Sequence, residues 1–268
     1  MKREVIRALR LFDGVPECER KAMQRLTDEA TSSPERELRD AAVDSLGSCT
    51  LAGKYWLELI VKSPADDGVR ERALKAHIGL STEADHAWYR LIWKPKKAED
   101  EDEKDKSGKL KNKRVPKKDE KDGEEEAKPR TGIVLNSMRL LAFDALVGKL
   151  TIEELKGAVT NEGFAKIRKS ALEELAQRMD PSTHELAWKV VKHDNEQAEN
   201  RVVAARIVAR IDGTKCAPEF IKRAMRVDVP VELRRGLAEI LVAFNDPDVN
   251  KALLAEMGRG KAHEKLFQ

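Results

Sequence analysis

Residues 38–47 read LRDAAVDSLG, and residues 167–176 read IRKSALEELA. Each stretch has an arginine in its second position and an alanine three residues later. Counted from the arginine, the third, fourth, seventh and eighth following residues are small or apolar, which is the pattern of one helix face. The two stretches therefore predict helices that bury the same side.

The same arginine recurs along nearly the whole chain. It stands at Arg39, Arg70, Arg139, Arg168, Arg201 and Arg234. Successive positions differ by 31, 69, 29, 33 and 33, and leaving out the segment 95–130 reduces the 69 to 33. Ile6-Arg7 precedes Leu38-Arg39 by one repeat length and fits a truncated first copy, in which Arg10 replaces the alanine. A constant spacing of this kind indicates a repeat architecture.

A second amphipathic segment follows each arginine helix, and three of these segments serve as examples. The predicted apolar faces are Tyr55, Trp56, Leu59 and Ile60, then Ala87, Trp88, Leu91 and Ile92, then Leu186, Ala187, Val190 and Val191. Turn signals separate the helices, among them Asp180-Pro181 and Asn245-Asp246-Pro247. Each unit is therefore predicted to be a helical hairpin, which can bury its apolar face only by stacking on its neighbours. We expect an all-α fold, a right-handed α-solenoid of about seven hairpins. Residues 1–94 form repeats 1–3, and residues 131–268 form repeats 4–7 and a C-terminal tail, in one continuous solenoid.

This pattern resembles the HEAT-repeat family over residues 33–94 and 131–258, and more weakly over residues 1–32. In that family an arginine of the first helix forms a ladder with acidic or asparagine residues between successive units. The resemblance implies that the six arginines are structural. It offers Asp67, Glu199 and Glu232 as acidic partners, with Asn136 and Glu162 serving in other units. Armadillo-type and other helical-pair repeats share much of the pattern, so the subfamily stays open.

Residues 95–130 have a different composition from the rest of the chain. They contain 13 basic and 12 acidic residues and almost no apolar ones, which predicts a disordered charged insert. An acidic block at 99–103 precedes a basic block at 109–118. The basic block could dock an acidic partner or serve as a localisation signal, or the whole insert could be a solvated loop.

Composition limits the function classes. Of the residues, 41% are hydrophobic, 37% are charged and only 4% are aromatic, and the net charge is +3. The near balance of charges gives no argument for nucleic acid or membrane as a partner. Cys18, Cys49 and Cys216 lie far apart, which argues against a disulfide framework or a zinc site. No signal peptide or membrane span is visible, so we expect a cytoplasmic protein that is not bound to a membrane.

Two sets of aromatic and basic residues on second helices are candidate binding surfaces. They are Tyr89, Arg90, Trp93 and Lys94, and Trp188, Lys189, Lys192 and His193. Aromatic planes beside cations can hold bases and phosphates, and HEAT-like DNA glycosylases bind duplex DNA. Nucleic-acid binding is therefore the alternative to our main expectation, a non-catalytic scaffold that binds a protein partner through the concave surface formed by its second helices.

A third class of function is an enzyme that resembles the HEAT-like di-iron hydroxylases or bilin lyases. Its only hints are His184-Glu185 and His263-Glu264, which do not occupy equivalent positions and are interpreted as surface residues. His77 interrupts an apolar column, and there a hydrogen-bonded core histidine is expected. We assign no catalytic residue, metal ion or cofactor.

Overall fold

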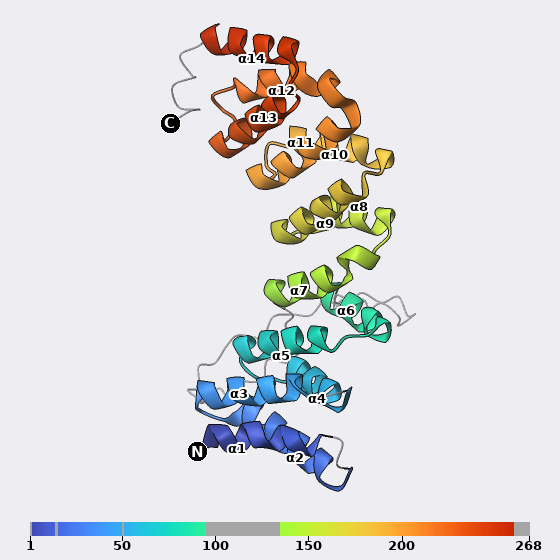
Figure 1. The fold of residues 1–268 in the computed structure, drawn as a ribbon, viewed down its shortest axis with the longest axis vertical. Helices are drawn as coiled ribbons and strands as arrows, with labels where there is room; N and C mark the ends of the chain where they lie inside the picture. Colours follow the sequence, from blue (N-terminus) through green and yellow to red (C-terminus); the bar gives the residue numbers. More distant parts are fainter. Residues whose placement is uncertain (1, 14–15, 50, 95–134, 260–268) are drawn as a thin grey trace, which may run out of the picture. The chain divides into compact units, whose positions relative to one another are not determined.

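The computed structural model describes residues 2–13, 16–49, 51–94 and 135–259 (Figure 1). Every regular element in these ranges is a helix, and they contain no strand, so the all-α prediction is confirmed. The predicted disordered insert, residues 95–130, lies outside the described residues. Among the described helices, none combines the length and the apolar character needed to cross a membrane.

The chain divides into two compact units, residues 1–145 and 146–268. The helices α1 to α7 of unit 1 are α1 Lys2–Leu9, α2 Pro16–Ser32, α3 Arg36–Gly47, α4 Leu51–Lys62, α5 Asp67–Gly79, α6 His86–Trp93 and α7 Asn136–Leu146, whose last residue falls beyond the division. The helices α8 to α14 of unit 2 are α8 Ile152–Asn161, α9 Ala165–Arg178, α10 His184–Lys192, α11 Ala198–Asp212, α12 Ala217–Ala224, α13 Val231–Ala243 and α14 Pro247–Arg259. Short 3-10 turns lie at Arg10–Phe12, Glu83–Asp85, Val147–Lys149, Pro181–Thr183 and Gly213–Cys216. Helix α7, which the sequence places with the later repeats, lies almost wholly within unit 1.

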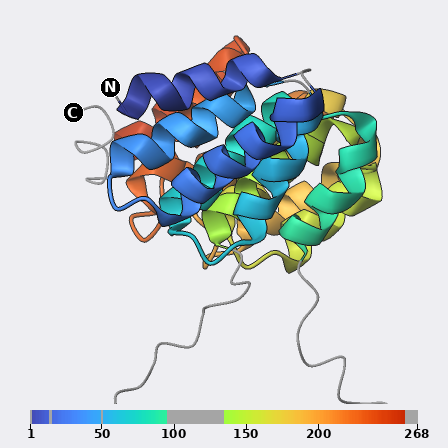
Figure 2. The ribbon, with the colours of Figure 1, turned by 90° about the horizontal axis from the view of Figure 1, so that it is seen from below.

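Within unit 1 the helices pack in a regular order. Helix α3 packs between α1 and α5, α2 packs on both α3 and α4, and α4 packs on α5. Figure 2, seen from below, shows α1 beside the mark of the N-terminus and α3 next to it. Ala42, Val43 and Leu46 of α3 are fully buried in this packing. The third, fourth and seventh positions after Arg39 thus form the core, as the sequence predicts.

Unit 2 repeats the same order. Helix α11 packs between α9 and α13, and each is joined by the helix before it, α8 on α9, α10 on α11 and α12 on α13. Ala171, Leu172 and Leu175 are at most 1% exposed, so the positions after Arg168 behave like those after Arg39. Burial of such side chains contributes roughly 1.5–3 kcal/mol for each leucine-sized group.

Side-chain caps start helices α8 and α14, and the cap of α14 lies at a turn that the sequence predicts. The carboxylate of Asp246 accepts hydrogen bonds from the backbone N–H groups of Asp248 and Val249 at the start of α14. Thr151 and Glu154 form a capping box at the start of α8, in which each side chain bonds the other residue's backbone N–H. These bonds satisfy donors that a helix N-terminus leaves without partners.

Two predicted apolar faces are wrong by about one residue. On α4 the buried residues are Leu57, Ile60 and Val61, whereas Tyr55 is 60% and Leu59 is 37% exposed. Both α4 and α6 are apolar on most sides, so periodicity over about two turns does not choose between adjacent faces.

On α6 the shift is the same. Tyr89, Ile92 and Trp93 are buried, and Leu91 is 56% exposed. In α10, where lysines interrupt the pattern, the predicted residues Ala187, Val190 and Val191 are buried.

Candidate binding surfaces

Three of the repeated arginines join a first helix to the second helix that precedes it. The Nε atoms of Arg70, Arg139 and Arg201 donate to the backbone oxygens of Val61, Trp93 and Val191, each at 3.0 Å. These carbonyls lie at helix C-termini, where a helix leaves its last oxygens without internal donors. The three arginines are therefore structural, as the repeat pattern predicts.

The other ends of these guanidinium groups meet polar side chains near their own helices. Arg70 pairs with Asp67 at 3.4 Å, and Arg139 donates to Asn136 at 3.2 Å. Both partners were expected from the sequence. Arg201 instead donates to Asp194 at 3.1 Å, and Glu199, its expected partner, pairs with Lys169 at 2.7 Å.

Arg39 and Arg168 use a second arrangement that joins successive hairpins. Nη1 of Arg168 donates to the carbonyl oxygens of Glu162 and Gly163 at 2.8 and 3.1 Å. Its Nε and Nη2 donate to the two carboxylate oxygens of Glu196, both at 2.8 Å. Burial opposes ionisation of Glu196, but hydrogen bonds from Arg168, from the backbone and from Asn200 outweigh it and lower the pKa of this carboxyl group.

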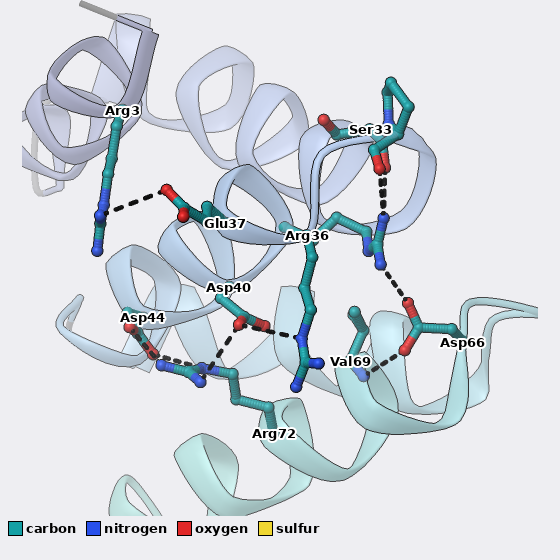
Figure 3. A network of polar contacts seen from close by, with 11 residues as sticks. Arg3, Ser33, Arg36, Glu37, Asp40, Asp44, Asp66, Val69 and Arg72 are labelled. Atoms are coloured by element: carbon teal, nitrogen blue, oxygen red, sulfur yellow. Dashed lines mark hydrogen bonds and ion pairs between the residues drawn. The ribbon is translucent and has the colours of Figure 1, made fainter.

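Arg39 has the corresponding contacts in unit 1. Its Nη1 donates to the carbonyl oxygens of Ser33 and Pro34, and its Nη2 lies 3.0 Å from Asp66. Figure 3 shows Asp66 also accepting from the backbone N–H of Val69, at 3.0 Å, as the N-cap of α5. Asp66 and Glu196 each stand four positions after the end of a second helix, a signal that could have identified them in the sequence.

Further charged pairs surround this contact between α3 and α5. Arg72 of α5 donates to both carboxylate oxygens of Asp44 on α3, at 2.8 and 2.7 Å, and lies 3.7 Å from Asp40 (Figure 3). The hollow in this place, about 850 Å³, is lined mainly by such charged residues. Its charges largely satisfy one another, so it is a hairpin contact rather than a binding site.

Arg234 differs from Arg70, Arg139, Arg168 and Arg201, whose Nε atoms all donate a hydrogen bond. The Nε of Arg39 is also buried without a partner among the described residues, but both of its Nη atoms have partners. Arg234 is 7% exposed, and its Nε is buried without a hydrogen-bond partner in the described chain. This nitrogen therefore does not bond the expected partner Glu232. A nearly buried cation without such bonds contributes little or negatively to stability.

Two substitutions test this difference. Arg201→Met is expected to lower the free energy of unfolding of unit 2 by about 1–3 kcal/mol, because the carbonyl of Val191 loses its donor. Arg234→Met is expected to change it by less than about 0.5 kcal/mol, or to raise it, because the buried Nε bonds none of the described residues. Urea denaturation followed by far-UV circular dichroism measures both, and equal losses would contradict the assignment.

The first predicted binding surface is largely core. Tyr89 is fully buried and Trp93 is 1% exposed, so their prediction as binding residues is wrong. The ring of Trp93 packs edge-on against Phe143 with centroids 4.8 Å apart. Only Arg90 and Lys94 of this set are exposed, with the Lys94 ammonium 4.2 Å from the Trp93 centroid. An aromatic residue at this register fills the gap between α6 and its neighbours instead of facing a ligand.

Tyr89 has a buried partner on α5. The Nδ1 atom of His77, which is 1% exposed, lies 2.9 Å from the Tyr89 hydroxyl, and the imidazole ring stacks at a tilt on Trp88 at 4.5 Å. The prediction of a hydrogen-bonded core histidine is therefore confirmed. Burial lowers the pKa of His77 and raises the pKa of Tyr89 to about 12.

The lowered pKa of His77 predicts acid sensitivity of unit 1. As the pH falls below about 6.5, the unfolded chain gains a proton at this site that the folded chain resists. Stability is thus present above the unfolded pKa and is lost as the pH falls, by at most about 1.4 kcal/mol per pH unit. Urea midpoints of the protein and of His77→Gln, compared between pH 7.5 and 5.5, should differ in slope. Parallel pH profiles would show that His77 does not contribute.

The second predicted surface is exposed in part. Lys189, Lys192 and His193 are exposed on or just after α10. Trp188 is only partly buried, but its indole N–H donates to Asp212 at 3.1 Å, and its ring meets Phe220 of α12 edge-on at 5.6 Å. Trp188 therefore joins three helices and is not free to stack on a base.

Asp212 links Trp188 to His184. The Nε2 atom of His184 lies 2.9 Å from the same carboxylate oxygen. Burial raises the pKa of Asp212, but hydrogen bonds from His184 and Trp188 outweigh it and hold the pKa below its usual value. His184 is thus engaged by Asp212 and not by the adjacent Glu185, while His263-Glu264 lies outside the described residues.

Two kinds of group that could carry chemistry are metal-binding clusters and reactive thiols. The described residues contain no cluster of three or more His, Cys, Asp or Glu side chains that could hold a metal ion. Burial raises the pKa values of Cys49 and Cys216 to about 11, so both thiols stay protonated and weakly nucleophilic.

An open groove lies between α12 and α14 in unit 2. Its volume is about 950 Å³, and Ile221, Met225 and Val249 supply its larger apolar side chains. Lys222 of α12 is exposed at its edge. The groove was not predicted, because its lining residues read as ordinary core and surface positions of two helices.

Unit 1 exposes apolar residues on its second helices. Tyr55 and Leu59 lie on α4, and Leu91 lies on α6. Two lysine side chains of α4 reach α6: the ammonium of Lys62 lies 6.0 Å from the centroid of Trp88, and Lys54 pairs with Asp85, directly before α6. These three residues, Tyr55, Leu59 and Leu91, are called the apolar row below.

Comparison of the chain with protein-family models, with curated proteins and with solved structures finds no match.

Proposed function

We propose that the chain is a right-handed α-solenoid of about seven HEAT-like hairpins, which binds a protein partner through its second helices and catalyses no reaction. The contacts between hairpins support the repeat. Lys54 donates to Thr82, Arg168 donates to Glu196, and Lys169 donates to Glu199, each pair close to one repeat apart in the sequence. Contacts at the repeat spacing are typical of arrays in which each hairpin packs on the next.

The observation that carries the binding function is the apolar row. Leu59 and Leu91 are one repeat apart and occupy the same register, each the third position after a tryptophan, Trp56 and Trp88. They are 37% and 56% exposed, and Tyr55 is 60% exposed. Tyr55 and Leu59 are four residues apart on one helix and therefore share a face. Exposed apolar side chains that form a patch mark interaction sites, whereas single ones are ordinary. Repetition of the feature on two neighbouring second helices favours a common surface.

Site-specific photo-cross-linking in cells tests this proposal. A benzophenone amino acid at Leu59 or Leu91 should yield a discrete cross-linked protein band that survives nuclease treatment. The matched control is Lys75 on α5, a first helix, whose side chain is 57% exposed. Bands of equal strength from Lys75, or no bands from the apolar row, would contradict the proposal.

The exposed lysines of unit 2 favour nucleic-acid binding as a second candidate. Lys189 and Lys192 on α10 are exposed, and the Trp188–Phe220 contact places Lys222 of α12 on the neighbouring helix. Binding through such cations weakens steeply with salt. Retention of duplex DNA at low salt that is lost in a Lys189→Ala, Lys192→Ala variant would support this candidate, and no retention would remove it.

A further inference from the structure

The groove between α12 and α14 exists because both helices present small residues to it. Ala217 and Pro218 lie on the α12 side, and Ala252 and Ala255 lie on α14. Side chains of this size do not fill the space between two helices, and about 950 Å³ is left. Pro218, Ala252 and Ala255 are exposed, so the space is an open trough whose floor is Ile221 and Val249, which are 6% and 7% exposed.

The two edges of the trough carry opposite charges. Lys222 stands on the α12 edge, and Asp248 stands on the α14 edge. Arg226 is also at the α12 edge, but it pairs with Asp228. The contact between Trp188 and Phe220 places α10 beside α12, and Lys189 and Lys192 of α10 are exposed.

An apolar floor between small residues and opposite charged edges suits one kind of ligand. A helix can lie in such a groove with apolar side chains at positions i, i+3, i+4 and i+7. The small alanines permit close approach of its backbone. The charges then select its orientation, because acidic side chains on one flank would face Lys222 and basic ones on the other flank would face Asp248.

We propose that this groove binds an amphipathic helix of a partner protein. The acidic flank of that helix faces α12 and α10, and its apolar face lies in the trough. This inference rests on the proposed function and names the chemistry of a partner. The groove belongs to unit 2, so it is independent of the apolar row in unit 1. An extended nucleic acid suits the lysines but not the apolar floor.

The probe is a designed, fluorescein-labelled helical peptide of about five turns, with leucines at i, i+3, i+4 and i+7, glutamates on one flank and lysines on the other. Fluorescence anisotropy with the full chain should show saturable binding. Ala255→Leu, which fills the trough, and Lys222→Glu, which reverses its edge, should each weaken binding about tenfold or more. Replacing the peptide's glutamates with lysines, so that both of its flanks are basic, should restore binding to the Lys222→Glu variant, because lysines then face both Glu at position 222 and Asp248.

Ala243→Leu is the matched control, because Ala243 lines a separate hollow of about 420 Å³ between α11 and α13. It should leave binding unchanged, and circular dichroism should show that all three variants are folded. Absence of saturable binding, equal weakening by Ala243→Leu, or no effect of Lys222→Glu would overturn the inference. Competition by a short DNA duplex that depends on Lys222 would also overturn it and assign the surface to nucleic acid. Loss of peptide binding with cross-links retained at Leu59 and Leu91 would refute this inference and leave the proposed function standing.

Discussion

Replacing Gly53 with alanine is expected to lower the free energy of unfolding of unit 1 by about 3 kcal/mol. Gly53 lies near the start of α4, where that helix crosses the end of α3. A methyl group at this position would overlap the carbonyl oxygen of Leu46 and stand 2.9 Å from the Cβ atom of Cys49. The oxygen belongs to the backbone of α3 and cannot move alone, so the whole α3–α4 hairpin must open.

The measurement is urea denaturation followed by tryptophan fluorescence in a Trp188→Phe background. Trp56, Trp88 and Trp93 then report on unit 1 alone. A neutral or stabilising Gly53→Ala would show that the two helices are not in such close contact.

The control for this substitution is Gly157→Ala in unit 2. Gly157 lies inside α8, and a methyl group there meets nothing within 4 Å. Alanine should raise the stability of unit 2 by about 0.5–1 kcal/mol at that site through helix propensity, which far-UV circular dichroism measures. The opposite signs of the two changes would separate the steric effect at Gly53 from a general effect of removing glycine.

Replacing Trp93 with alanine is expected to lower the stability of unit 1 by about 3–5 kcal/mol. The side chain is 1% exposed and contacts Phe143 of α7. The loss would leave a large cavity where α6 meets α7. It would also disturb the carbonyl oxygen of Trp93, which accepts the hydrogen bond from Arg139.

Trp93→Phe separates packing from polar effects. It keeps an aromatic ring against Phe143 and removes an indole N–H that is buried without a hydrogen-bond partner in the described chain. The loss in the free energy of unfolding should therefore be smaller for Trp93→Phe than for Trp93→Ala, by at least about 2 kcal/mol. Chemical denaturation in the Trp188→Phe background compares the two variants. An alanine variant as stable as the parent would restore Trp93 as a surface residue.

Trp93 also shows why the candidate site was only partly predictable. An aromatic residue beside lysines has the same sequence pattern whether its ring faces a ligand or the core. At Trp188 the ring is partly exposed but is held by Asp212, which lies on the following first helix. No local sequence pattern links Trp188 to Asp212, 24 residues later in the chain, because only the packing of α10, α11 and α12 brings the two side chains together.

The amino-acid sequence alone determined the helical class, the register of the arginines and the buried positions of the first helices, such as Ala42 and Leu172. These features depend on spacing within a few turns of one helix, which is encoded locally. The tertiary structure alone decided which apolar face of α4 and α6 is buried. It also decided that Arg168 meets Glu196, while the Nε of Arg234 has no hydrogen-bond partner among the described residues. Those outcomes depend on contacts between segments about one repeat apart, where several side chains of similar chemistry compete and only packing geometry selects among them.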